Sequence, residues 1–240
     1  MSRVVGDLLT LLILLILLMT LTRSLNVLLL HGKGGSANKF KEKLKPLTTA
    51  FNSNTWHFID APYTLPRDRI RLNTEKRGIN SSTDDIDDLA WWLLPEGVRS
   101  FEATSYEGVE KSIDIIEQHI KSKKIDVLVG HSQGAMIATV ITARSLLRIS
   151  EVQLKGSIIS SAAWPLPYDH LLEDLRKSKT TSMITIHTIG FNDKVNPPSH
   201  SRRIADCFKS STDVHIVDHE GGHVLPLSSA AFSTYSKLLK

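Results

Sequence analysis

The sequence predicts an α/β fold in which a mainly parallel central sheet is flanked by helices on both faces. From residue 25 onward, short apolar runs of strand length alternate with amphipathic stretches of helical length. The 240 residues are 41% hydrophobic and 22% charged, an ordinary globular composition that excludes disordered and low-complexity classes. The single cysteine cannot form an internal disulfide, and no cysteine or histidine pair has zinc-site spacing, so one large domain must be stabilised by its core.

The predicted strands begin with the apolar run Asn26–Gly32, whose terminal glycine turn is typical of a buried parallel strand. The six predicted strands are 26–31, 55–60, 125–130, 154–160, 183–189 and 213–218. The predicted helices are 38–51, 107–121, 133–148, 199–210 and 228–239. In the second helix, apolar residues recur at spacings of four, three and four. This stripe consists of Val109, Ile113, Ile116 and Ile120.

A segment from about 61 to 106 interrupts the alternation and is predicted to be a lid-like element, a binding loop or a locally disordered stretch. Its charge clusters are interpreted as solvated faces. They consist of Arg67, Arg69, Arg71, Lys76 and Arg77, followed by Asp84, Asp85, Asp87 and Asp88. Trp91 and Trp92 are expected to form either a buried aromatic anchor or, with Trp164, part of the substrate pocket.

Residues 1–24 form a separate hydrophobic leader ahead of the domain, which is expected to span 25–240. Residues 8–21 are an unbroken apolar run of 14 residues, about 21 Å as a helix against about 30 Å for a hydrocarbon core. This length suits a signal peptide or a weak anchor, so we expect a membrane-associated or secretory location. The alternative is an additional hydrophobic helix packed on the fold of a cytoplasmic protein. Thr22-Arg23-Ser24 offers small residues at both flanks for cleavage but lacks the usual Ala-x-Ala pattern.

Ser132 is the candidate nucleophile. It lies in Gly130-His131-Ser132-Gln133-Gly134, which matches G-x-S-x-G and stands between a predicted strand and a predicted helix. Glycines at both flanks allow a tight, strained turn that presents the hydroxyl at the carboxyl edge of the sheet. The alternative is a serine with only a structural role in the turn.

A serine hydroxyl needs a base and an orienting acid before it can attack a carbonyl group. His223 follows Gly221 and Gly222 after the last predicted strand and is the candidate base. Asp193 is the candidate acid, 61 residues after Ser132 and 30 before His223. Asp218 at the end of the last strand is a competing acid, and His223 has the alternative of an ordinary loop histidine.

The oxyanion of such a reaction needs two preorganised donors. We expect the backbone amide of Gln133 to be one of them. The other is expected to be the backbone amide of Lys33 in the glycine-rich loop after the first strand. A plain turn and a phosphate cradle are the alternatives for this loop, although the P-loop pattern fails because Lys33 is followed by Gly34.

The remaining histidines and the cysteine are given structural roles. His31 and His131 adjoin the candidate site but stand beside turn glycines. The other strand histidines are expected to be core or surface residues, namely His57, His187 and His215. Cys207 is far in sequence from any histidine motif, so a nucleophilic role is not expected. The net charge of +4 is spread along the chain and does not imply nucleic-acid binding.

Several separated motifs resemble the FSH-type serine hydrolases, a branch of the α/β-hydrolase fold that includes fungal FSH proteins and a human ovarian-cancer-associated homologue. They are Leu30-His31-Gly32, Phe58-Ile59-Asp60-Ala61-Pro62, Ala90-Trp91-Trp92, Tyr106-Glu107-Gly108 with Ser112, Gly130–Ala135 and His219–Pro226. The resemblance covers roughly residues 26–240 and differs in His131, where the family often has Phe, and in the loop Gly34–Ala37, where it usually has Gln-Asn.

The resemblance implies hydrolysis of carboxylic ester or thioester bonds by a Ser132–Asp193–His223 triad, on a small acyl substrate and without cofactor or metal. The alternatives are an acyl-protein thioesterase or lysophospholipase, and a hydrolase-fold binding protein that no longer reacts.

Overall fold

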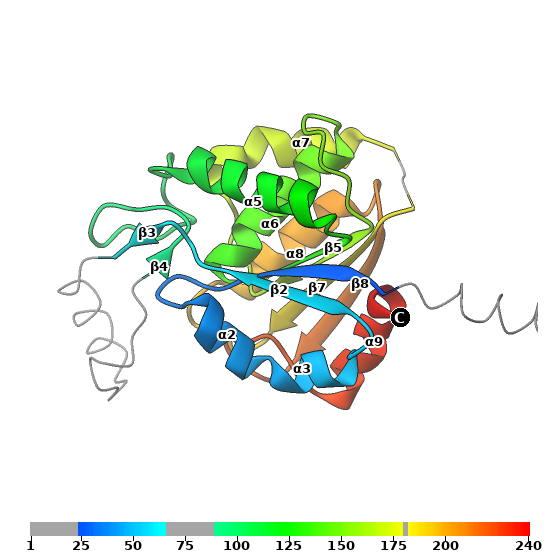
Figure 1. Cartoon of the computed structure of the whole chain (residues 1–240). Helices are drawn as coiled ribbons and strands as arrows, with labels where there is room; N and C mark the ends of the chain where they lie inside the picture. The colour runs from blue at the N-terminus through cyan, green and yellow to red at the C-terminus, as the bar shows by residue number, and fades with distance from the viewer. Residues whose placement is uncertain (1–23, 66–88, 180–181) are drawn as a thin grey trace, which may run out of the picture.

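A computed structural model describes residues 24–65, 89–179 and 182–240 of the chain (Figure 1). Its centre is a six-stranded sheet of order β2-β1-β5-β6-β7-β8, in which every neighbouring pair is parallel. The strands are β1 (Asn26–Leu30), β2 (Thr55–Ile59), β5 (Val127–His131), β6 (Gly156–Ser160), β7 (Ile184–Gly190) and β8 (Asp213–His219). The predicted parallel sheet is therefore confirmed, with all six predicted strands within about two residues of their observed bounds.

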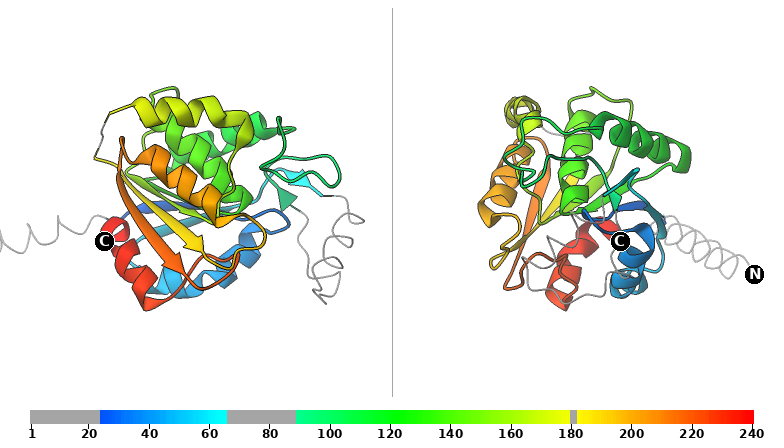
Figure 2. Two further views of the ribbon diagram at one scale, coloured as in Figure 1. Left: turned by 180° about the vertical axis from the view of Figure 1, so that it is seen from behind. Right: turned by 90° about the vertical axis from the view of Figure 1, so that its left-hand side faces the viewer.

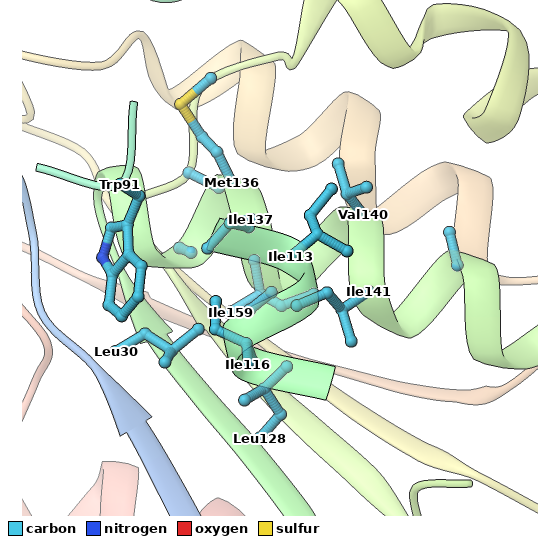
Figure 3. Packing of buried hydrophobic residues seen from close by; sticks show 14 of the residues in the cluster. Leu30, Trp91, Ile113, Ile116, Leu128, Met136, Ile137, Val140, Ile141 and Ile159 are labelled. Carbon is cyan, nitrogen blue, oxygen red and sulfur yellow. The ribbon is translucent and has the colours of Figure 1, made fainter. Parts of the chain in front are cut away.

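Helices cover both faces of the sheet (Figures 1 and 2). One layer contains α5 (Val109–Lys123), α6 (Gln133–Leu146), α7 (Asp169–Lys177) and α8 (Pro198–Phe208). The opposite layer contains α2 (Ala37–Lys43), α3 (Lys45–Ala50) and α9 (Ser229–Leu239). Because successive side chains of a strand point to opposite faces of the sheet, alternate residues of one strand pack against different helical layers. In β1, Leu28 and Leu30 pack in the core with α5 and α6, where Figure 3 shows Leu30. Val27 and Leu29 pack in the other core.

Two helical regions differ from the prediction. The predicted helix 38–51 is broken at Leu44 into α2 and α3, because Pro46 has no N–H to continue the hydrogen-bond ladder to the Glu42 carbonyl. Helix α7 was not predicted, and it follows a 3-10 turn, η2 (Leu166–Tyr168). It buries three residues on one side: Leu171, Leu172 and Leu175.

The described parts of the irregular segment are attached to the main domain. Strands β3 (Tyr63–Thr64) and β4 (Leu89–Ala90) pair antiparallel, and Leu93 forms an isolated bridge with Glu107. The basic and acidic clusters between Arg67 and Asp88 lie outside the described residues, as does the apolar run 8–21. Among the described residues, no helix is long and apolar enough to cross a membrane.

Candidate active site

The turn between β5 and α6 holds Ser132 in a strained conformation. Its φ of 56° and ψ of −118° lie in a region that residues with a side chain rarely occupy. A Cβ on Gly130 would collide with the Gly134 carbonyl, and a Cβ on Gly134 would collide with the carbonyl of Leu30 at the end of β1. The glycines of the motif therefore allow three backbone segments to meet beneath Ser132, as the sequence predicts for a nucleophile turn.

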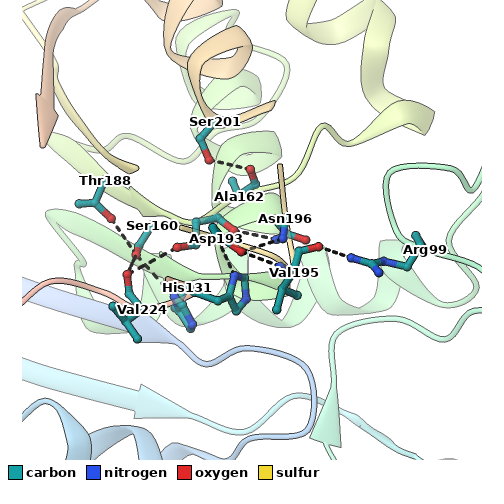
Figure 4. Close-up of polar contacts among 12 residues, drawn as sticks. Arg99, His131, Ser160, Ala162, Thr188, Asp193, Val195, Asn196, Ser201 and Val224 are labelled. Carbon is teal, nitrogen blue, oxygen red and sulfur yellow. Dashed lines mark hydrogen bonds and ion pairs between the residues drawn. The ribbon is translucent and has the colours of Figure 1, made fainter. Parts of the chain in front are cut away.

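Asp193 and His223 approach each other from the loops after β7 and β8. The His223 ring contacts the carboxylate through a hydrogen bond of 2.8 Å between Nδ1 and Oδ2. The other carboxylate oxygen accepts the backbone amides of Val195 at 2.8 Å and Asn196 at 2.9 Å (Figure 4). Every hydrogen bond here is donated toward the carboxylate, which favours its ionised form.

The charge of Asp193 is set by two opposing effects. Burial alone would raise the pKa of its carboxyl group, but the hydrogen bond from His223 and those from the Asn196 and Val195 amides outweigh burial and lower this pKa. An ionised carboxylate at Nδ1 selects the tautomer whose Nε2 is a free base and stabilises an imidazolium ring. The arrangement is therefore suited to general-base chemistry at His223.

The competing acid, Asp218, is engaged elsewhere. It is exposed on β8 and forms an ion pair with Arg202 at 2.7 Å. The hydrogen-bonded carboxylate partner of His223 is thus Asp193 rather than Asp218.

His131 connects the histidine loop to the nucleophile turn. Its ring centroid lies 4.9 Å from that of His223, and its own backbone immediately precedes Ser132. The ring also stacks on Phe40 of α2, with 6.3 Å between centroids. Burial, and next the proximity of His223, hold the pKa of His131 well below its ordinary value, so a neutral ring supports His223.

The two candidate oxyanion donors lie at the same edge. Gln133 begins α6, where the first amides of a helix have no intrahelical acceptor, and no described residue accepts a hydrogen bond from its backbone N–H. Lys33 lies in the loop after β1, which is held by hydrogen bonds from Gly34 to the Leu89 carbonyl at 2.8 Å and from Gly35 to Gly32 at 3.1 Å.

The side chain of Gln133 has a role that sequence reasoning missed. Its Oε1 accepts the Trp91 amide at 2.8 Å, and its Nε2 donates to the Trp92 carbonyl at 3.0 Å. The indole of Trp91 donates to the His31 carbonyl at 2.8 Å, and His31 accepts the Ala61 amide at 3.1 Å. These contacts bind the segment after β4 to the nucleophile turn and to the end of β1.

Trp91, Trp92 and Trp164 are buried side chains that anchor their segments in the core. Trp91 and Trp92 are at most 1% exposed, and Trp164 is 3% exposed. Trp92 stacks on Tyr106, with 4.4 Å between ring centroids, inside the core of the α5–α6 layer. The motif spacing gave no signal for the Gln133 contacts, because their partners are about 40 residues away in sequence.

Solved structures with the same architecture show that this is the α/β-hydrolase fold. Esterase PE8 is 19% identical, with a TM-score of 0.60 and coverage of 91% of this chain and 92% of that one. SOBER1 from Arabidopsis thaliana is 14% identical, with a TM-score of 0.58 and coverage of 90% of this chain and 98% of that one.

A family model described as Serine hydrolase (FSH1) matches residues 19–235, so the chain belongs to the FSH1 serine hydrolase family. Esterase OVCA2 of Danio rerio is 25% identical over 224 residues, covering 90% of this chain and 96% of the relative. Esterase OVCA2 of Homo sapiens is 24% identical over 227 residues, covering 92% and 98%. The resemblance inferred from the motifs is confirmed, and the protein is an ester-hydrolysing enzyme.

Proposed function

We propose that this enzyme cleaves carboxylic ester or thioester bonds through a Ser132–Asp193–His223 triad and an acyl-enzyme intermediate. The observation that carries the proposal is the 2.8 Å hydrogen bond between His223 and Asp193 at the sheet edge that also bears the strained Ser132. Family membership supports the same chemistry, because its model is that of a serine hydrolase.

In the first half-reaction, Nε2 of His223 takes the proton of the Ser132 hydroxyl while Oγ forms a bond to the acyl carbon. The tetrahedral intermediate collapses when His223 returns the proton to the departing oxygen or sulfur, which leaves an acyl-serine. Water then attacks this ester, again with His223 as base, and releases the carboxylic acid and free Ser132. Asp193 stays ionised throughout and stabilises the imidazolium form of His223.

The negative oxygen of each tetrahedral intermediate is assigned to the backbone amides of Gln133 and Lys33. The Gln133 assignment is supported by its place at the first turn of α6, where the helix end carries partial positive charge. The Lys33 assignment is supported by the glycines at 32, 34 and 35, which let the loop turn a backbone amide inward.

Labelling with a fluorophosphonate probe tests the nucleophile. Wild-type protein is expected to gain one covalent adduct, Ser132→Ala none, and Ser236→Ala in α9 the same adduct as wild type. A folded wild-type protein that stays unlabelled would favour the alternative of a hydrolase-fold binding protein.

The acid is tested by comparing two carboxylates at neighbouring strand ends. Asp193→Asn is expected to lower kcat by about 10⁴-fold, because the amide would hold the wrong tautomer of His223. Asp218→Asn is the matched control and is expected to keep nearly the full rate, since Asp218 pairs with Arg202 instead. Equal rates for wild type and Asp193→Asn would exclude the assignment.

The substrate class is tested with a panel of short-chain esters, acyl-CoA thioesters, acylated peptides and lysophospholipids. Preference for simple esters or acyl-CoA supports the proposed carboxylesterase or thioesterase. Preference for acylated peptides or lysophospholipids supports the alternatives of an acyl-protein thioesterase or a lysophospholipase.

The leader is assigned to membrane attachment or secretory targeting, on the apolar run 8–21. The intact mass of the mature protein will show whether this run is removed, and carbonate extraction of membranes will show whether it anchors the enzyme. An uncleaved chain that stays in the soluble fraction would contradict the assignment.

A further inference from the structure

The carboxyl end of β6 is where all three candidate catalytic loops attach. We call Ser160, which is labelled in Figure 4, and the next residue, Ser161, the β6 junction. The amide of Ser132 donates to the Ser160 carbonyl at 3.0 Å, and the side-chain amide of Asn196 donates to the Ser161 carbonyl at 2.7 Å. The hydroxyl oxygens of both junction serines lie 3.5 Å from the carbonyl of Val224, the residue after His223. The nucleophile, acid and base loops thus share one support.

The backbone of the junction, like that of the nucleophile turn, contains a serine with a positive φ. Ser161 is buried and has a φ of 53°, a left-handed conformation that costs energy for a residue with a side chain. Its amide is held by the Thr188 carbonyl of β7 at 3.1 Å, and its carbonyl accepts the Asn196 side chain. Contacts from both sides therefore fix the direction in which the Ser161 carbonyl points.

Asn196 links this junction to the candidate acid. Its backbone amide donates to Oδ1 of Asp193 at 2.9 Å, while its side chain donates to the Ser161 carbonyl. The residue is buried, at 8% exposure, so this side-chain bond does not compete with bulk water. On the outer side of the loop, the guanidinium of Arg99 donates to the Val195 carbonyl. Asn196 is the buried tether of the acid loop, and Arg99 is its exposed one.

We propose that Asn196 is a positioning residue that holds Asp193 in register with His223 by tying the acid loop to the β6 junction. The inference rests on the proposed triad. Without the side-chain bond, the Asp193 carboxylate would shift relative to the imidazole, and misplacement by about 1 Å can cost about 100-fold in rate. Because Asn196 touches neither substrate nor reacting atoms in this scheme, its effect should pass through Asp193 alone.

The test compares Asn196→Ala with Ser201→Ala. Ser201 in α8 is also buried, and its hydroxyl donates to the neighbouring Ala162 carbonyl at 2.8 Å (Figure 4). Both variants lose one buried hydrogen bond to adjacent carbonyls, so a merely structural effect would alter them alike. We expect kcat of Asn196→Ala to fall by about 10-fold to 100-fold with KM little changed, and Ser201→Ala to keep the wild-type kcat.

A double-mutant cycle supplies the second readout. In the Asp193→Asn background, Asn196→Ala is expected to cause no further loss of kcat, because the group that it positions is already gone. Independent, multiplying losses would overturn the inference, as would equal losses in Asn196→Ala and Ser201→Ala. If Asn196→Ala does not fold, Asn196→Leu keeps nearly the same side-chain volume without any donor, and a wild-type kcat for that variant would also overturn the inference.

The inference and the proposed triad can fail separately. Unchanged turnover in Ser132→Ala or Asp193→Asn would remove the triad itself. Loss of turnover in those two variants, with full turnover in Asn196→Ala, would leave the triad standing and refute only the role of Asn196.

Discussion

Replacing His187 by leucine is expected to remove a pH-dependent instability from the fold. His187 lies in β7 and is completely buried, with its ring 5.4 Å from that of Phe208. Within the described residues, neither ring nitrogen has a hydrogen-bond partner. Burial lowers the pKa of His187 from 6.5 to about 3, and the charge of Asp206 opposes this only in part.

The sign and size of the effect follow from proton linkage. Because the pKa of His187 is lower in the folded state, acid protonates the unfolded chain first. The free energy of unfolding is therefore undiminished by His187 above pH 6.5 and falls as the pH drops toward 3. At about 1.36 kcal/mol per pKa unit, lowering the pH from 7 to 5 costs about 2 kcal/mol at this residue. Leucine has no proton to bind and leaves no unpaired nitrogen, so it should also add about 1–3 kcal/mol at pH 7.

Urea unfolding at pH 7 and pH 5 measures both effects. The stability of wild type should fall by about 2 kcal/mol more between the two pH values than that of His187→Leu. His170→Leu is the matched control, since His170 is exposed on α7, and its pH dependence should equal that of wild type. The same pH dependence in His187→Leu and wild type would refute the reasoning.

Two further predictions concern the nucleophile turn. Gly134→Ala should prevent correct folding or greatly lower thermal stability, because its Cβ would meet backbone carbonyls at the end of β1 rather than a movable side chain; a Tm within a few degrees of wild type would contradict this. Gln133→Leu should cost about 2–6 kcal/mol in urea unfolding, since it leaves the buried Trp91 amide and Trp92 carbonyl unpaired. Its backbone amide remains, so the folded variant should still react with a fluorophosphonate; loss of labelling without loss of stability would show that the side chain acts in the chemistry.

Local patterns were sufficient to predict most of the fold. Short apolar runs identified the six parallel strands, and helical spacing of apolar residues identified α5. Sequence periodicity did not predict helix α7, because the helix has only nine residues and three buried leucines are too few to establish a helical period. The break between α2 and α3 depends on Pro46, which interrupts the predicted helix 38–51.

Some features of the candidate site could be predicted from local sequence, whereas others depend on the tertiary structure. The sequence by itself determined that Ser132 would stand on a tight turn between a strand and a helix, because glycine spacing and local hydrophobicity are properties of adjacent residues. Only the tertiary structure decided between Asp193 and Asp218, since both lie near the carboxyl ends of neighbouring strands and differ in the side chains that they contact. The sequence could not predict the side-chain contacts of Gln133 and Asn196 either. Each contact joins segments about 35 to 40 residues apart, and packing of the whole sheet decides how closely these segments approach.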